Sequence, residues 1–174
     1  MTLDMHNMTG RIKRFVFLSA AFLFVAAFDI RLHIKHYEIT TDQTAETLRI
    51  ALLTDLHSCK YGKDGETLIR AIDSQQPDLI LLGGDICDDV IPDDNVEALL
   101  EGISRRYPCY YVTGNHEYWS GRIDDILELF RSYHVTVLNG SSDTIKIGAQ
   151  PVTVCGVTDP DAVTYAGAAD IRSQ

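Results

Sequence analysis

The sequence lacks the patterns that mark several common kinds of site. Its four cysteines are far apart, so it has neither a Cys-x-x-Cys zinc or redox motif nor a dense disulfide framework. No GxxxxGK[ST] or GxGxxG loop follows an apolar run, and no GxSxG is present. These absences exclude a P-loop nucleotide site, a dinucleotide-binding fingerprint and a serine-hydrolase nucleophile elbow.

Basic residues are also scarce, because 15 Lys and Arg stand against 25 Asp and Glu, for a net charge of −10. The first 36 residues carry +3, so the rest of the chain carries −13. An acidic body argues against binding to nucleic acid phosphates and is compatible with collecting divalent cations. The length fits one modest domain. Its cysteines are Cys59, Cys87, Cys109 and Cys155, and we expect them to act as small core hydrophobes, with the alternative for Cys59 that it lines a site without binding anything.

A basic cluster and an apolar run occupy the N-terminus. Arg11, Lys13 and Arg14 precede an apolar stretch over 15–28 that only Ser19 interrupts. Fourteen helical residues reach about 21 Å, less than the roughly 30 Å hydrocarbon core. The pattern over residues 1–35 therefore predicts a signal anchor or a signal peptide cleaved near Ala27. The anchor is favoured over the cleaved peptide and over a buried core helix. In either targeting case the following domain, 36–174, would lie outside the cytoplasmic membrane, and it would be secreted after cleavage.

The body alternates apolar runs with amphipathic segments. The pattern predicts strands over 48–54, 77–85 and 108–117 and helices over 65–76, 94–107 and 122–134, followed by three strands within 135–159. Alternation of strand and helix is typical of an α/β fold with a parallel sheet. In such a fold, ligands bind at the carboxyl ends of the strands.

Polar groups follow each of the first three predicted strands. They are Asp55-Leu56-His57, Gly83-Gly84-Asp85 and Gly114-Asn115-His116-Glu117. Side chains two apart in an extended segment share a face, which would direct Asp55 and His57 to one spot. Parallel strand ends lie side by side, so we expect five groups in one crevice: Asp55, His57, Asp85, Asn115 and His116.

Carboxylate, amide and imidazole ligands without thiolates suit two catalytic cations, Mn, Fe or Zn, better than a structural zinc site. Asp85, on the central strand of the three, is the natural carboxylate for the two cations to share. Hydroxide formed between the cations could attack phosphorus in line, and His116 could supply a proton to the leaving group.

The three blocks and their wording, "TDLHSCKYG", "PDLILLGGD" and "YYVTGNHEYW", resemble the calcineurin-like metallophosphoesterases, in particular a bacterial membrane-linked or exported subgroup. The resemblance implies a sandwich of two mixed sheets flanked by helices. It also implies that Asp55 and His57 bind the first metal, Asp85 bridges, Asn115 binds the second and His116 assists catalysis. Implied substrates are phosphomonoesters, phosphodiesters or pyrophosphates, among them envelope or nucleotide-lipid phosphoesters, and the implied location is the cell membrane.

The sequence departs from this family in one respect. The family's later strands carry a Gly-His and a Gly-His-x-His block, but no histidine follows His134 here. The chain therefore resembles the N-terminal part of such an enzyme, with the sandwich incomplete and apolar faces uncovered. The missing histidines could come from a second polypeptide or from further coding sequence. The alternative function is an inactive metal-binding remnant or an interaction module.

Three residues beside the motifs remain open. Glu117 is expected to support the ligands or begin a helix rather than to bind metal. Tyr118 and Trp119 could contact a lipid or a base, but packing is the favoured interpretation. The acidic segment "CDDVIPDDN" is expected to be solvated charge and helix capping.

Overall fold

The computed structural model describes residues 15–17, 32–44 and 46–160. The chain divides into two compact units, Met1–Lys35 and His36–Gln174. In the first unit Phe15, Val16 and Phe17 are helical and exposed. The rest of the predicted apolar segment lies outside the described residues. No described helix is long and apolar enough to cross a membrane. All elements named below belong to the second unit.

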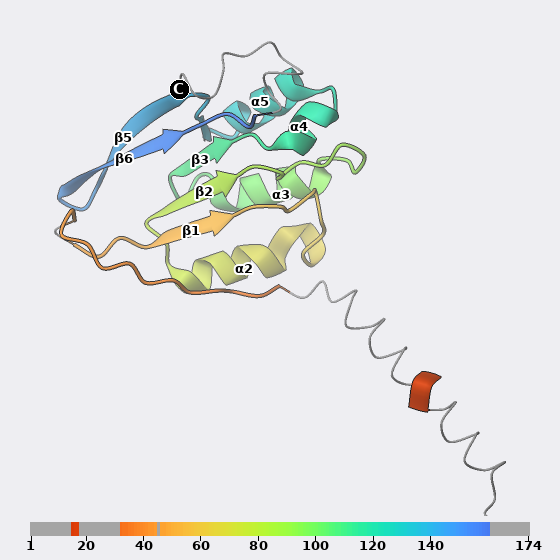
Figure 1. The fold of residues 1–174 in the computed structure, drawn as a ribbon, viewed down its shortest axis with the longest axis horizontal. Coiled ribbons are helices and arrows are strands. Elements are labelled where there is room, and N and C mark those ends of the chain that lie inside the picture. Colours follow the sequence, from red (N-terminus) through yellow and green to blue (C-terminus); the bar gives the residue numbers. More distant parts are fainter. Residues whose placement is uncertain (1–14, 18–31, 45, 161–174) are drawn as a thin grey trace, which may run out of the picture. The chain divides into compact units, whose positions relative to one another are not determined.

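A parallel sheet forms the centre of this unit (Figure 1). Its strands are β1 (Ile50–Leu53), β2 (Leu79–Gly83), β3 (Cys109–Val112) and β4 (Thr136–Val137), in spatial order β1-β2-β3-β4. Each connection crosses through helices, as a parallel pairing requires. These are η1 (Lys63–Gly65) with α2 (Glu66–Gln75), then α3 (Asp94–Ile103), then α4 (Asn115–Trp119) with α5 (Ile123–Ser132).

One face of the sheet is buried together with the apolar stripes of these helices. Strand side chains alternate between faces, so Ile80 and Leu82 of β2 share a face with Cys109 and Tyr111 of β3. The Tyr111 ring stacks on Phe130 of α5 with centroids 3.7 Å apart, and both side chains are fully buried. The remaining buried residues of α2, α3 and α5 are Leu68, Ile72, Val96, Leu99, Leu100, Ile103 and Ile126.

An antiparallel hairpin packs on the opposite face. It consists of β5 (Ser141–Ile147) and β6 (Gln150–Gly156). Leu79, Tyr110 and Leu138 form a buried cluster against partly buried residues of the hairpin, namely Ile145, Ile147, Val152 and Val154. On β1, Ile50 and Leu52 pair in register with Leu79 and Leu81 but remain 47% and 66% exposed. The hairpin therefore covers the β3 side of this face and leaves the β1 side open.

The α/β class and the predicted order of elements are confirmed. The two sheets are, however, each of one kind in the described residues, one parallel and one antiparallel, rather than mixed. The cysteine prediction holds for Cys87 and Cys109, which are buried, and is wrong for Cys155, which is exposed. Cys59 is also exposed, as its alternative place in the lining of a site allows. Cys155 lies on β6, where outward-facing positions meet solvent because only one face of the hairpin packs on the sheet.

Removal of the Phe130 ring tests the core. We expect Phe130→Ala to lower the free energy of unfolding by about 3 to 5 kcal/mol, because it leaves a cavity against Tyr111. Phe130→Leu, which keeps most of the volume, should cost much less. Urea denaturation followed by circular dichroism measures both, and equal losses for the two variants would contradict this packing.

Candidate metal centre

The loops that leave β1 and β2 run side by side beyond the sheet. Figure 1 shows the ends of β1, β2 and β3 along one edge of the sheet. The backbone N–H of Asp55 donates to the carbonyl of Gly84 at 3.2 Å, and that of His57 donates to Asp85 at 2.9 Å. Ser58 continues the series by donating to Ile86 at 3.0 Å. Two of the predicted clusters are thus fixed to one another through the backbone.

The β1 loop does not continue as an extended strand. β1 ends at Leu53, and Asp55, His57 and Ser58 have φ values of 55°, 46° and 50°. The expectation that Asp55 and His57 share a face by strand alternation is therefore wrong. Non-glycine residues at positive φ are uncommon and mark a backbone that surrounding contacts hold in place. Asp85, with φ 52°, repeats this feature in the neighbouring loop.

Two glycines allow the β2 and β3 loops to touch. Gly84 has φ 91°, and a Cβ there would lie 2.9 Å from the backbone of Gly114. A Cβ on Gly114 would approach the Asp85 carboxylate and backbone within 2.2 to 2.7 Å. Real side chains do not tolerate such distances, so both positions require glycine. The close approach lets the N–H of His116 donate to Asp85 Oδ1 at 3.0 Å.

The carboxylate of Glu117 connects the same two loops from inside the protein. Glu117 is fully buried, and its Oε1 accepts N–H groups of Ile86 at 2.7 Å and Cys87 at 3.0 Å. Its Oε2 accepts those of Asp85 at 3.0 Å and Gly114 at 2.8 Å. A carboxylate is a suitable acceptor for four converging N–H donors, because charge-assisted hydrogen bonds are the strong ones. Glu117 therefore supports the site and does not face it.

The buried negative charge of Glu117 also affects its neighbours. Burial raises the pKa of Tyr111 well above its ordinary value, and the Glu117 carboxylate adds to the rise. Burial likewise raises the pKa of the Cys87 thiol, with added effects from Asp93 and Glu117. Cys87 is thus held as a neutral thiol next to the β2 loop and offers no thiolate to a metal.

Two aspartates of the acidic segment face the histidines. Asp88 Oδ1 accepts the N–H groups of Val90 and Ile91, each at 2.8 Å. The Ile91 contact contributes most to lowering the pKa of the Asp88 carboxyl, followed by Val90 and by the nearby His57 and His116. Asp88 Oδ2 lies 3.7 Å from His57 Nδ1.

Asp89 Oδ1 lies 3.1 Å from His116 Nδ1. The expectation of solvated charge is therefore incomplete for this segment, because two of its carboxylates lie within the site. The signal in the sequence was a second pair of acids three and four residues after Asp85.

The structure brings together His57, Asp85 and His116, each offering a ligand atom within 4.8 Å of the others. The two imidazole rings meet edge to face with centroids 4.4 Å apart. His57 Nδ1 is buried and has no hydrogen-bond partner among the described residues. A buried polar atom without a partner is costly, and a cation would satisfy it. The residues present therefore fit a divalent metal with nitrogen and oxygen ligands.

The other two predicted ligands, Asp55 and Asn115, are close in sequence to His57 and His116 of this cluster. Asp55 is exposed on the β1 loop and does not belong to the three-residue cluster. Asn115 is half-buried and is the first residue of α4. That short helix replaces the strand exit predicted through residue 117. Ligation by Asp55 and Asn115 stays a prediction from the motifs, as does the bridging role of Asp85.

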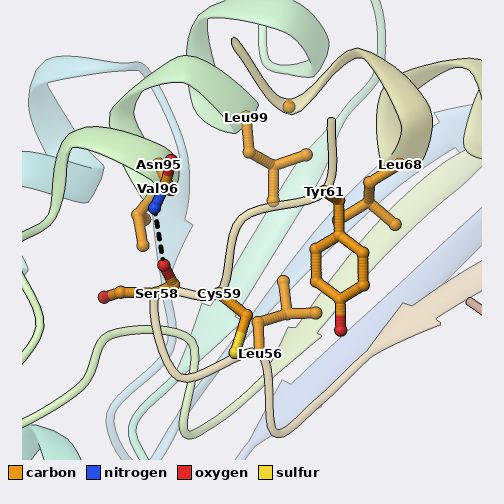
Figure 2. Close-up of a pocket in the computed structure, with 9 residues that line it drawn as sticks. Leu56, Ser58, Cys59, Tyr61, Leu68, Asn95, Val96 and Leu99 are labelled. Atoms are coloured by element: carbon orange, nitrogen blue, oxygen red, sulfur yellow. Dashed lines mark hydrogen bonds between the residues drawn. The ribbon is translucent and has the colours of Figure 1, made fainter. Parts of the chain in front are cut away.

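A small recess lies between the β1 loop and α3 (Figure 2). Its empty volume is about 250 Å³, part of it open solvent, and Leu56, Ser58 and Cys59 contribute to its lining. Asn95 Nδ2 donates to the carbonyl of Ser58 at 2.9 Å, which ties the loop to α3. None of the predicted site residues lines this recess, but Leu56 and Ser58, which flank His57 in the sequence, do.

Comparison with known proteins decides the family. A sequence model of the family described as "Calcineurin-like phosphoesterase" matches residues 48–166. The chain belongs to the calcineurin-like phosphoesterase family. A Helicobacter pylori protein named "Uncharacterized metallophosphoesterase" is 31% identical over 131 residues, 72% of this chain and 34% of that protein. A Bos taurus protein named "Transmembrane protein with metallophosphoesterase domain" is 29% identical over 130 residues, 73% of this chain and 28% of that protein.

This calcineurin-like phosphoesterase chain spans about a third or less of the length of those relatives. The matched region contains the strands and loops that carry Asp55, His57, Asp85, Asn115 and His116. The predicted family is thus confirmed, and the membrane-linked bacterial subgroup stays a prediction.

Replacement of Glu117 tests its supporting role. We expect Glu117→Gln to lower the free energy of unfolding by about 3 kcal/mol, because an amide group would face two of the four N–H donors. We also expect affinity for Mn²⁺ to fall about tenfold in the folded fraction, because the loops carrying the ligands lose their common support.

Glu97→Gln is the matched control, since Glu97 is exposed on α3. Denaturation measures the stability and calorimetry measures the metal affinity. Equal behaviour of the two variants would show that the Glu117 charge has no role.

Proposed function

We propose that this protein is a metal-dependent phosphoesterase that hydrolyses phosphomonoester, phosphodiester or pyrophosphate bonds. The observation that carries the proposal is the cluster of His57, Asp85 and His116 at the strand ends of a calcineurin-like fold, with a buried His57 nitrogen that has no hydrogen-bond partner among the described residues. Two divalent ions, Mn, Fe or Zn, fit the predicted ligand set of Asp55, His57, Asp85 and Asn115.

Such ions, when bound, neutralise phosphoryl oxygens and lower the pKa of water so that hydroxide forms near neutral pH. The protein must supply the remaining parts of the reaction. The loop segments 84–97 and 113–121 contain no Lys or Arg that could neutralise a phosphate. His57 and Asp85 are therefore proposed to hold cations and, through them, to orient the phosphoryl group.

His116 is proposed to transfer a proton to the leaving group. Its Nδ1 lies 3.1 Å from Asp89 Oδ1, which favours a hydrogen on Nδ1 and fixes the ring. In the protonated imidazole, Nε2 is then the nitrogen that can donate to a departing alkoxide. The backbone hydrogen bond from His116 to Asp85 fixes the distance between this group and the ligands.

The alternative function is a metal-binding module without catalysis. Binding of a cation by His57, Asp85 and His116 does not by itself require turnover. The two functions share the metal and differ only in turnover, so one assay separates them.

Replacement of Asp85 provides that assay. With Mn²⁺ present, we expect the 174-residue chain to hydrolyse an aryl phosphate. We expect Asp85→Asn to reduce kcat/KM at least about a hundredfold, because a neutral amide lacks the negative charge that a carboxylate shares between two cations. Chelation should abolish activity of the unmodified protein, and Mn²⁺ should restore it.

Asp124→Asn is the matched control, because Asp124 is exposed in the first turn of α5. Mn²⁺ binding without any turnover would support the binding module. If the chain shows no Mn²⁺ binding and no turnover, both functions are refuted for this chain.

We further propose that the N-terminal segment places the domain at the outer side of a bacterial cell membrane, facing envelope phosphoesters. The basic cluster before the apolar run supports this orientation. The name of the bovine relative, a transmembrane protein, is consistent with tethering.

Fractionation of bacterial cells that express the chain tests the tether. We expect the protein to stay with membranes after an alkaline carbonate wash, and the double variant Phe22→Arg with Val25→Arg to be released, because charges within an apolar segment oppose insertion. Partition of both proteins into the soluble fraction would refute anchoring, and a shortened protein outside the inner membrane would show cleavage instead.

A further inference from the structure

An aromatic row leads from the metal cluster to the surface. His57 meets His116 edge to face at 4.4 Å, and His116 meets Trp119 at 4.8 Å with the rings tilted by 50°. Trp119 is 48% exposed, whereas its neighbour Tyr118 is only 4% exposed and accepts a hydrogen bond from Thr113 Oγ1. The structure thus distinguishes the roles of two aromatic residues that the sequence alone treats alike. Tyr118 packs, and Trp119 extends the row outward.

We propose that Trp119 is a specificity-determining residue that stacks against a planar, unsaturated ring in the substrate, beside the phosphoryl group. The inference rests on the proposed phosphoesterase function. Trp119 follows His116 by three residues in α4, so the helix backbone holds both side chains on one side.

The position of Trp119 points to the leaving group. His116 is proposed to donate its proton to the departing oxygen, while His57 and Asp85 hold the phosphoryl side. A ring in contact with His116 therefore borders the group that departs. Asp89, which lies against His116 Nδ1, limits how far His116 can turn away from this arrangement.

Charge near the site favours a planar ring over a membrane surface as the occupant. Val90 and Ile91 are also exposed, 83% and 41%, but they follow the carboxylates of Asp88 and Asp89. The loop segments 84–97 and 113–121 contain no Lys or Arg to attract anionic lipids, and the β1 loop carries a single one, Lys60. Stacking on an indole needs no complementary charge, because every unsaturated ring presents a π-face.

The first test uses the fluorescence of Trp119, which is the single tryptophan of the chain. The Mn²⁺-loaded 174-residue protein is mixed with adenosine 5′-monophosphate or with ribose 5-phosphate, and emission is recorded before turnover. The two probes share sugar and phosphate and differ in the base. We expect the nucleotide to quench Trp119 and to bind at least about fivefold more tightly. A second comparison, of phenyl phosphate with ethyl phosphate, repeats the test without a nucleobase. It distinguishes a nucleobase from another aromatic group as the source of the planar ring.

The second test compares variants by calorimetry with the same probes. Trp119→Leu should abolish the preference for the nucleotide and leave the affinity for ribose 5-phosphate unchanged, whereas Trp119→Phe should retain most of the preference. Tyr37→Leu, at a residue that is 84% exposed, is the control for loss of a surface aromatic side chain. A change in stability alone would not alter the ratio of the two affinities.

Equal affinity for both probes in the unmodified protein, or an unchanged preference in Trp119→Leu, would overturn the role of Trp119 while the phosphoesterase function stands. No binding of any phosphate probe to the metal-loaded protein would overturn both proposals. If Trp119→Leu does not fold, the unmodified protein and Trp119→Phe still decide the question.

Discussion

The site depends on one buried carboxylate. Glu117 accepts four backbone N–H groups, three from the loop after β2 and one from the residue before α4. No salt bridge joins it to a Lys or Arg within residues 32–44 and 46–160, and these four backbone N–H groups stabilise its charge. Because a buried N–H group without a partner is costly, this carboxylate dictates the path of both loops. The positions of Asp85 and His116 follow from it.

Around this constraint the backbone adopts conformations that isolated loops avoid. Asp55, His57, Ser58 and Asp85 all have positive φ, and the N–H groups of the first three donate to backbone carbonyls of the β2 loop. The sheet supplies the rigid support, since parallel pairing in register brings the ends of β1, β2 and β3 together. Strain at the site is thus balanced by hydrogen bonds and by the buried core on either face of the sheet.

Much of the fold could be predicted from the sequence because its signals are local. Alternation of apolar strands and amphipathic helices predicted the parallel sheet, and the apolar runs within 135–159 predicted the final strands. The candidate site was predictable for the same reason, since motif residues directly follow strands whose ends must be adjacent. Residues His57, Asp85 and His116 do meet. The proposed specificity of Trp119 could not be separated from packing at that level, because both readings require the same aromatic residue after the same motif.

The sequence by itself determined the α/β class, the family and the edge of the sheet at which the polar groups gather, because period and spacing along the chain encode them. Only the tertiary structure decided how those groups are held. Strand alternation wrongly predicted the local geometry of Asp55 and His57, since contacts with the β2 loop override the extended conformation. The tertiary structure also placed Asp89 against His116, Glu117 in the protein interior and Trp119 at the surface. Such assignments depend on contacts between residues distant in the chain, and no local pattern specifies them.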